Sequence, residues 1–396
     1  MNRLKLNTLI IAVTACAFSI ISSAQSNIVD SFDFQGNDKS LSIKDAVELV
    51  LKDSPDMAKR NNEIEKNKIT VQNINYNVSR AIGHVDKGSI GYLNGVAKMQ
   101  LQADYLEASG KRNYDAQVKK LAADIENAYY SELQAEENVK INKENLDVAK
   151  KNDEITKKKF DLGLVSKQDV LSSESNVLKA QNDLESSQNK LTKAKMSFNI
   201  QLNLNVMDKV KLTDQLKYEE FNPGKIADAV ASALSKRNEL KGAEYQLKTQ
   251  EIATEVERLT NDKSDNYANA KRDLEQGLRD YNNSLKNIEL EIRSNYLDIT
   301  EKKDAIVSGQ KSVDLAQEAL KIAQVSYDNG MNTITDLQKA QVALQQAKLG
   351  VSKAVLDYKL AILKYQDSID VGRTVAGGSS GSSAGAGASA SASFED

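Results

Sequence analysis

The chain has 396 residues, of which 28% are charged and only 5% aromatic, and its formal net charge is −3. The presence of only 2 prolines and no tryptophan favours long helices packed through small aliphatic side chains over a compact, aromatic-rich core. The lone cysteine, Cys16, excludes an intrachain disulfide, and the lone histidine, His84, argues against histidine-rich metal sites and Ser-His-Asp chemistry. Charges of both signs are interleaved without a basic stripe, which argues against nucleic-acid binding.

Residues 1–24 have the features of a signal peptide, so we expect the protein to be exported. Arg3 and Lys5 supply the basic start, an apolar stretch follows, and small residues lead up to a cleavage site after Ala24. A permanent membrane helix fits less well, because the apolar stretch is short and contains polar residues. Lipidation at Cys16 is the alternative, but the chain stays apolar after this cysteine, which favours cleavage after Ala24.

The rest of the chain contains one internal repeat. The triplet Asp-Ala-Val that begins at Asp45 returns at Asp228, an offset of 228 − 45 = 183. A Phe-Asp-Leu-Gly segment ending at Gly163 returns as Tyr-Asp-Asn-Gly ending at Gly330, an offset of 330 − 163 = 167. The two copies therefore differ by one length change, which falls between the first helix of each copy and the long helix after it. This pattern predicts two tandem structural repeats.

Each repeat ends in a helix with a seven-residue pattern. Large side chains recur every seven residues after Gly163 and again after Gly330, and small side chains lie three positions further on. The large sets are Val170, Val177, Leu184, Leu191 and Phe198, then Leu337, Leu344, Val351, Tyr358 and Tyr365. A strict heptad keeps its seam facing a partner only when the helices supercoil, so we expect an all-α fold of long antiparallel coiled-coil hairpins.

The two hairpin tips are predicted by glycine and capping residues. Gly163 can end the incoming helix in a left-handed conformation, and Ser166 with Asp169 three residues later can begin the outgoing one. Gly330, Thr333 and Asp336 repeat this arrangement. The incoming helix of the first repeat should cover residues 96–159 and reach on the order of 90 Å.

These segments resemble the TolC-like outer-membrane efflux family over residues 41–369. The resemblance implies a homotrimer whose hairpins form one hollow α-barrel, docked through a periplasmic adaptor (membrane fusion) protein to an inner-membrane transporter. An enzyme is the third interpretation, and the sequence itself argues against it and against a catalytic, cofactor or metal site: it has no Gly-rich phosphate loop and no nucleophile–base constellation, and its carboxylates lie at helical spacing among lysines. The residues that would contact the adaptor are Gly163, Leu164, Val165, Gly330, Met331, Asn332 and Thr333. Asp169 and Asp336 would lie near the constricted entrance, although as first-turn residues of helices they need no pore role.

The chain departs from this family in its strand regions. Family members carry a pair of strands between the first and the long helix of each repeat. Here residues 83–95 are rich in glycine, with strand character only at residues 89–93, and residues 261–266 form a polar turn. A membrane-spanning strand needs about 9–11 alternating residues. The sequence therefore predicts little β-structure and a much reduced or absent β-barrel.

The domain organisation follows from these features. We expect a signal peptide (residues 1–24), an irregular leader (25–40), a first helical repeat (41–221), a second helical repeat (222–372) and a Gly/Ser/Ala-rich disordered tail (373–396). The function expected is an efflux or secretion duct of the cell envelope, in the outer membrane or at the cell surface. A non-conducting structural coiled coil of the envelope with the same scaffold is the alternative.

Overall fold

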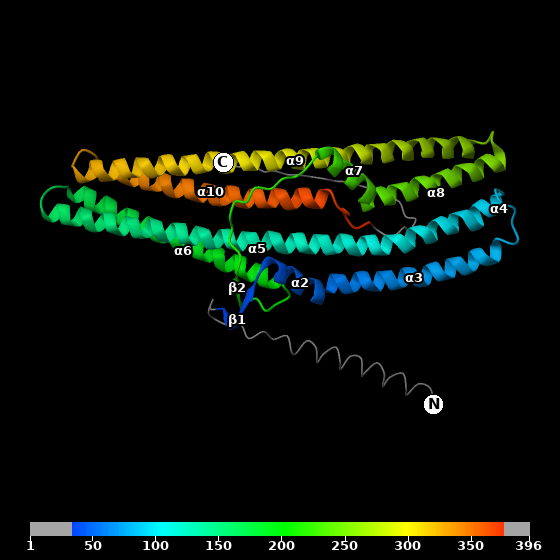
Figure 1. Cartoon of the computed structure of the whole chain (residues 1–396), viewed down its shortest axis with the longest axis horizontal. Coiled ribbons are helices and arrows are strands. Elements are labelled where there is room, and N and C mark those ends of the chain that lie inside the picture. The colour runs from blue at the N-terminus through cyan, green and yellow to red at the C-terminus, as the bar shows by residue number, and fades with distance from the viewer. Residues whose placement is uncertain (1–33, 376–396) are drawn as a thin grey trace, which may run out of the picture.

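The computed structural model describes residues 34–375 and is an elongated, almost wholly helical molecule (Figure 1). Two helices of 64 residues each, α5 (Lys98–Asp161) and α9 (Asp265–Asp328), run along its whole length. At 1.5 Å per residue each spans roughly 95 Å. The predicted all-α fold with little β-structure is confirmed, and each predicted bound of the first long helix lies within two positions of the observed one.

The two predicted repeats are present. The first contains α2 (Ile43–Asp53), α3 (Pro55–Ala81), α5 and α6 (Lys167–Gln201), and the second contains α7 (Ile226–Lys236), α8 (Asn238–Asn261), α9 and α10 (Ile334–Ser368). Helices α2 and α7 begin at the offset predicted for the first helices, and α5 and α6 match α9 and α10 at both ends with the offset predicted for the tips. Each position in one long hairpin therefore has a counterpart in the other, which we call its repeat mate.

The helices follow one another in a row. Between the tips and the middle of the molecule α6 packs on α5, α5 on α10 and α10 on α9, and α6 also contacts α10 near the tips. In the other half the order is α3, α5, α8 and α9 (Figure 1). Helices α6 and α3 therefore form one side of the row, and α9 forms the other. This arrangement leaves α6 and α9 as outer helices, each packed mainly on its own hairpin partner.

A pair of parallel strands lies beside α5 near the middle of the molecule. Strand β1 (Gln35–Leu41) pairs with β2 (Asp208–Leu212), and Leu41 lies opposite Leu212. The hydroxyl of Tyr129 on α5, which is fully buried, lies 3.0 Å from the carbonyl oxygen of Leu41 and 2.9 Å from Oδ2 of Asp214. Burial raises the pKa of this tyrosine to about 12. The strand pair is thus held against the long helix by a buried tyrosine.

Three sequence expectations need correction at the edges of the repeats. Residues 25–40 were expected to be irregular, but residues 35–40 belong to β1. Residues 89–93, with their strand character, instead contribute to α4 (Ile90–Tyr92) and a π-helix, η1 (Leu93–Ala97), because Ser89 accepts a hydrogen bond from the Tyr92 amide as a helix cap. Residues 373–375, expected in the disordered tail, are fixed by Asn113, whose Oδ1 accepts the Val375 amide at 2.9 Å. The signal peptide, Cys16 and residues 376–396 lie outside the described residues.

Candidate functional site at the hairpin tips

Both hairpin tips lie at the same end of the molecule, where the row of helices ends in two exposed turns (Figure 1). In the first, Gly163 has φ of +72° and the Leu164 amide donates to the Lys159 carbonyl oxygen at 2.8 Å. In the second, Gly330 also has φ of +72° and the Met331 amide donates to the Ser326 carbonyl oxygen at 2.8 Å. The glycines end both helices in the left-handed conformation that the sequence predicted.

Reciprocal capping boxes begin the two outgoing helices. The Asp169 amide donates to Ser166 Oγ at 3.2 Å, and Asp169 Oδ2 accepts the Ser166 amide at 2.9 Å. The Asp336 amide donates in the same way to Thr333 Oγ1 at 3.2 Å, and Asp336 Oδ2 accepts the Thr333 amide at 3.3 Å. The hydrogen bonds from Thr333 hold the pKa of the Asp336 carboxyl below its ordinary value. Both acids therefore stabilise the tips themselves.

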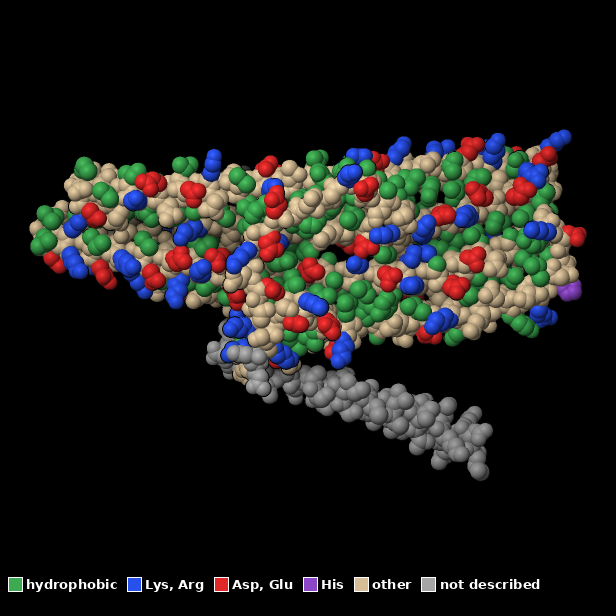
Figure 2. Space-filling view, viewed as in Figure 1, with side chains coloured by type: hydrophobic (Ala, Val, Ile, Leu, Met, Phe, Trp, Pro, Cys, Tyr) green, Lys and Arg blue, Asp and Glu red, His purple; other side chains and the backbone are tan. Residues whose placement is uncertain are grey.

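The tips present apolar side chains to solvent. Leu162, Leu164 and Met331 are 69–73% exposed, and we call these three residues the tip surface. Apolar atoms are visible at this end of the space-filling view (Figure 2). Most of the predicted adaptor-contact residues are exposed, and only Val165 is half-buried. An apolar patch at the extremity of a charged, elongated molecule is typical of an interaction site.

The two tips are fastened to each other by a contact that the sequence did not predict. Lys159 Nζ on α5 donates to the Tyr327 carbonyl oxygen at 2.8 Å and lies 3.9 Å from the centre of the Tyr327 ring. The Tyr327 hydroxyl in turn lies 2.9 Å from Thr156 Oγ1. Tyr327 is only 3% exposed, whereas its repeat mate Phe160 is 38% exposed. In the sequence, this contact was indicated only by the tyrosine at a position where the first repeat has phenylalanine.

A line of amide side chains joins α5 to α10 behind the tips, and we call it the amide seam. Asn152 Nδ2 donates to Gln341 Oε1 at 3.2 Å, and Gln341 Nε2 donates to Asn145 Oδ1 at 2.9 Å. Asn145 Nδ2 donates to Gln345 Oε1 at 3.1 Å, and Gln345 Nε2 donates to Asn142 Oδ1 at 2.7 Å. This network was not predicted from the sequence, although Asn145 and Asn152 lie one heptad apart.

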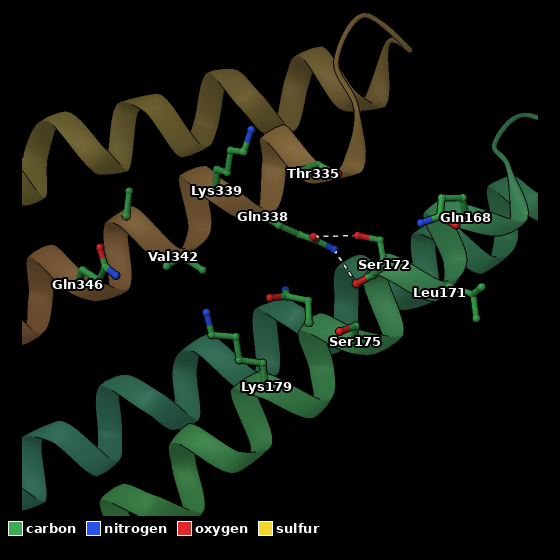
Figure 3. A pocket seen from close by; sticks show the side chains of 12 residues that line it. Gln168, Leu171, Ser172, Ser175, Lys179, Thr335, Gln338, Lys339, Val342 and Gln346 are labelled. Carbon is green, nitrogen blue, oxygen red and sulfur yellow. Dashed lines mark hydrogen bonds between the residues drawn. The ribbon is translucent and has the colours of Figure 1, made fainter.

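An open groove of about 640 Å³ runs between α6 and α10 near the tips (Figure 3). Ser172 and Gln338 cross it with two hydrogen bonds, both of 3.1 Å. Its walls are amide, hydroxyl, lysine and aliphatic side chains. The groove contains no nucleophile paired with a base, and residues 34–375 hold no group of three or more His, Cys, Asp or Glu side chains suited to a metal ion.

Comparisons with known proteins give matches only among solved structures. No protein-family model matches the sequence, and no curated protein matches it. The structure of CusC, described for its transmembrane channel formation, has a TM-score of 0.67 and 11% identity, with 87% of this chain and 97% of that chain covered. The chain has the fold of the TolC-type outer-membrane channels.

Two further structures share this TolC-type fold. The outer membrane protein VceC of Vibrio cholerae has a TM-score of 0.66 and 13% identity, covering 83% of this chain and 96% of that chain. The outer membrane channel MtrE of Neisseria gonorrhoeae, in its open state, has a TM-score of 0.64 and 13% identity, covering 84% and 91%. Among the described residues, no helix combines the length and the apolar character needed to cross a membrane.

Proposed function

We propose that the exported chain forms an efflux or secretion duct of the cell envelope, in the outer membrane or at the cell surface, as a homotrimer around a common bore. The observation that carries this proposal is the open row of helices, whose outer members α6 and α9 carry large exposed apolar side chains. These include Leu171, Leu178, Leu315 and Ile322, which are 50–73% exposed in the single chain. Surfaces of this kind on long coiled-coil helices favour assembly with further helices.

The tips are the proposed docking end. The tip surface, together with Gly163, Val165, Gly330, Asn332 and Thr333, offers a compact apolar and polar patch to a periplasmic adaptor protein that joins an inner-membrane transporter. Asp169 and Asp336 would surround the entrance of the bore. Three copies of these acids would concentrate negative potential there and favour cations. Support comes from solved structures that share this fold and are outer membrane channels.

The first test is the mass of residues 25–396, measured by light scattering in buffer and in detergent. A stable trimer in either condition is the expected result. A monomer or dimer in both conditions would contradict the duct and favour a non-conducting envelope coiled coil. Conductance of a purified trimer in a planar bilayer then separates a conducting assembly from a closed one.

A further inference from the structure

A short segment after α10 joins the two repeats, and we call residues 369–375 the strap. It leaves the end of α10 and passes between α8 and α5, in the half of the molecule remote from the tips (Figure 1). We propose that Asn113 of α5 and Asn238 of α8 form a binding site for an extended peptide, which the strap occupies reversibly as a clasp between the repeats. This site is independent of the proposed duct.

The two buried asparagines, one from each repeat, bind the strap by its backbone. Asn113 is 1% exposed and Asn238 is fully buried, and Asn238 Nδ2 donates to Asn113 Oδ1 at 2.8 Å. The Val371 carbonyl accepts from the Asn238 amide at 2.8 Å, and the Arg373 carbonyl accepts from Asn238 Nδ2 at 3.0 Å. Val375 exchanges two hydrogen bonds of 2.9 Å with the side chain of Asn113. Every second residue of the strap is therefore bound through main-chain atoms, as in a strand.

The asparagines need an occupant of this kind. Without the strap, Asn113 Nδ2 would keep only a 3.4 Å contact to Glu63 Oε1, and the Asn238 amide, at the start of α8, would lose its acceptor. Buried polar groups without partners are unfavourable. The strap, or the same backbone supplied as a separate peptide, satisfies these groups.

The matching positions of the other repeat do not form such a site. Asn238 corresponds to Pro55 in the first repeat, at the offset 238 − 55 = 183. Proline has neither an amide hydrogen nor a side-chain donor, so it cannot bind a backbone carbonyl. Asp280, the repeat mate of Asn113, is exposed. The site therefore belongs to the junction of the repeats and is not a feature that the repeat itself produces.

Selectivity for the strap comes from Gly372 and Val375. Gly372 has φ of +74°, and a Cβ added there would collide with the side chains of Arg237 and Glu239. Those two side chains are held in place, because Arg237 is 4% exposed and bound to Glu239 Oε1 at 2.9 Å. Val375 packs over Gly242, where α8 has no side chain. An occupant therefore needs glycine three residues before an aliphatic side chain.

Occupancy of the site joins the repeats at the end remote from the tips. The other contacts there include the stacked rings of Tyr105 and Tyr245, whose centres lie 4.2 Å apart, and the 3.1 Å hydrogen bond from Arg112 Nε to Asn238 Oδ1. These contacts join side chains only, whereas the strap is continuous with α10. Release of the strap should therefore loosen α8 from α5 and leave each helical hairpin folded.

A peptide added to a full-length variant tests the site. Gly372→Ala should displace the strap and leave both asparagines in place. A fluorescein-labelled peptide of residues 368–375 should bind this variant about tenfold more tightly than the parent, in which the strap competes, because the cost of the left-handed backbone falls on the strap alone. The same peptide carrying the Gly372→Ala change should bind about tenfold more weakly than the native peptide. Fluorescence anisotropy measures each affinity.

Gly224→Ala is the matched control. Gly224 has φ of +71° in the linker before α7, with open space around an added methyl group, so this change carries the backbone cost without disturbing the strap. It should not increase peptide binding. Equal binding to the parent and both variants, or no binding to a Gly372→Ala protein that circular dichroism shows to be folded, would overturn the site.

Hydrogen exchange of the parent chain gives a test that does not depend on the folding of a variant. The Asn238 and Val375 amides are both bound in the site, so they should exchange at one common rate. That rate should be slower than in a free peptide and faster than in the core of α5. Exchange as fast as in a free peptide would show that the site is not occupied, and exchange as slow as in α5 would show that the strap is not released.

Discussion

The ammonium group of Lys159 lies 3.9 Å from the centre of the Tyr327 ring and donates a 2.8 Å hydrogen bond to the carbonyl oxygen of the same residue. This contact joins the end of α5 to the end of α9, so it fixes the two tips relative to each other. The lysine side chain is only 18% exposed, which strengthens both interactions relative to a fully solvated site.

Lys159→Met should loosen the two tips. Loss of the hydrogen bond and of the cation–π contact should lower the free energy of unfolding by about 1–2 kcal/mol. Chemical denaturation followed by circular dichroism measures this, and hydrogen exchange at residues 326–331 should accelerate. Lys158→Met, which removes an exposed neighbouring lysine, is the control and should change little. Equal effects of the two substitutions would show that the contact does not hold the tips.

Gly163→Ala and Gly330→Ala should each destabilise a tip. Both glycines have φ of +72° and open space around an added methyl group, so the cost is that of the left-handed backbone alone, about 1–2 kcal/mol. Gly350→Ala is the matched control, because Gly350 lies within α10 and also has open space around it. That substitution should stabilise the helix by about 0.5–1 kcal/mol. The measurement is the midpoint temperature of thermal unfolding of the three variants. A shift of the same sign in all three would contradict the turn geometry.

Gln345→Ala should break the amide seam. It leaves Asn142 Oδ1, which is buried, and Asn145 Nδ2, which is part-buried, without these partners, and an unpaired buried group costs about 1–3 kcal/mol. Gln346→Ala, one residue along α10 and exposed, should be nearly neutral. The comparison is made by urea unfolding of the two variants under one set of conditions. If Gln345→Ala were as neutral as its neighbour, the network would not contribute to stability.

Stability should fall as the pH rises from about 4.5 to 7 because of Glu132 on α5. Its side chain is 1% exposed, its carboxyl oxygens have no hydrogen-bond partner, and burial raises its pKa from 4.5 to about 7, against a smaller opposing effect of Lys195. A carboxyl whose pKa is higher in the folded state than in the unfolded state favours folding while protonated. Ionisation of this carboxyl therefore lowers the free energy of unfolding, beginning near pH 4.5, and the loss is complete above pH 7, at about 3 kcal/mol.

Glu132→Gln removes this ionisation. The variant should match the parent near pH 4 and be more stable at pH 7.5, as measured by the midpoint of urea unfolding across the pH range. Glu154→Gln, at an exposed position of the same helix, is the control and should keep the parent's pH profile. An unchanged slope in Glu132→Gln would assign the pH dependence to other groups.

The repeats and tips were predictable because their causes are local. Glycine, a hydroxyl residue and an aspartate close together in the chain determine each turn, and the heptad determines the helices around it. Gly163 and Asp336 therefore behave as expected. Their roles toward an adaptor or a bore stay predictions, because those roles depend on molecules outside the chain.

The contacts between segments far apart in the chain could not be predicted from local sequence patterns. The amide seam depends on which faces of α5 and α10 meet, and its members, for example Asn145 and Gln345, lie far apart in the sequence. Strand β1 was missed because its partner β2 is short and belongs to a distant part of the chain. The buried Glu132 could have been noticed, since its repeat mate is Ile299, a core residue. A comparison of the repeats position by position would have found it.

The unbroken course of α5 and α9 has a mechanical consequence. Their neighbours α6, α10, α3 and α8 each cover one half of the length, whereas these two helices continue through the middle. A push or a twist applied at the tips would therefore be carried to the opposite end along two stiff, continuous helices. The shorter helices support these two helices from the side, and the strand pair is attached to α5 near its middle through Tyr129.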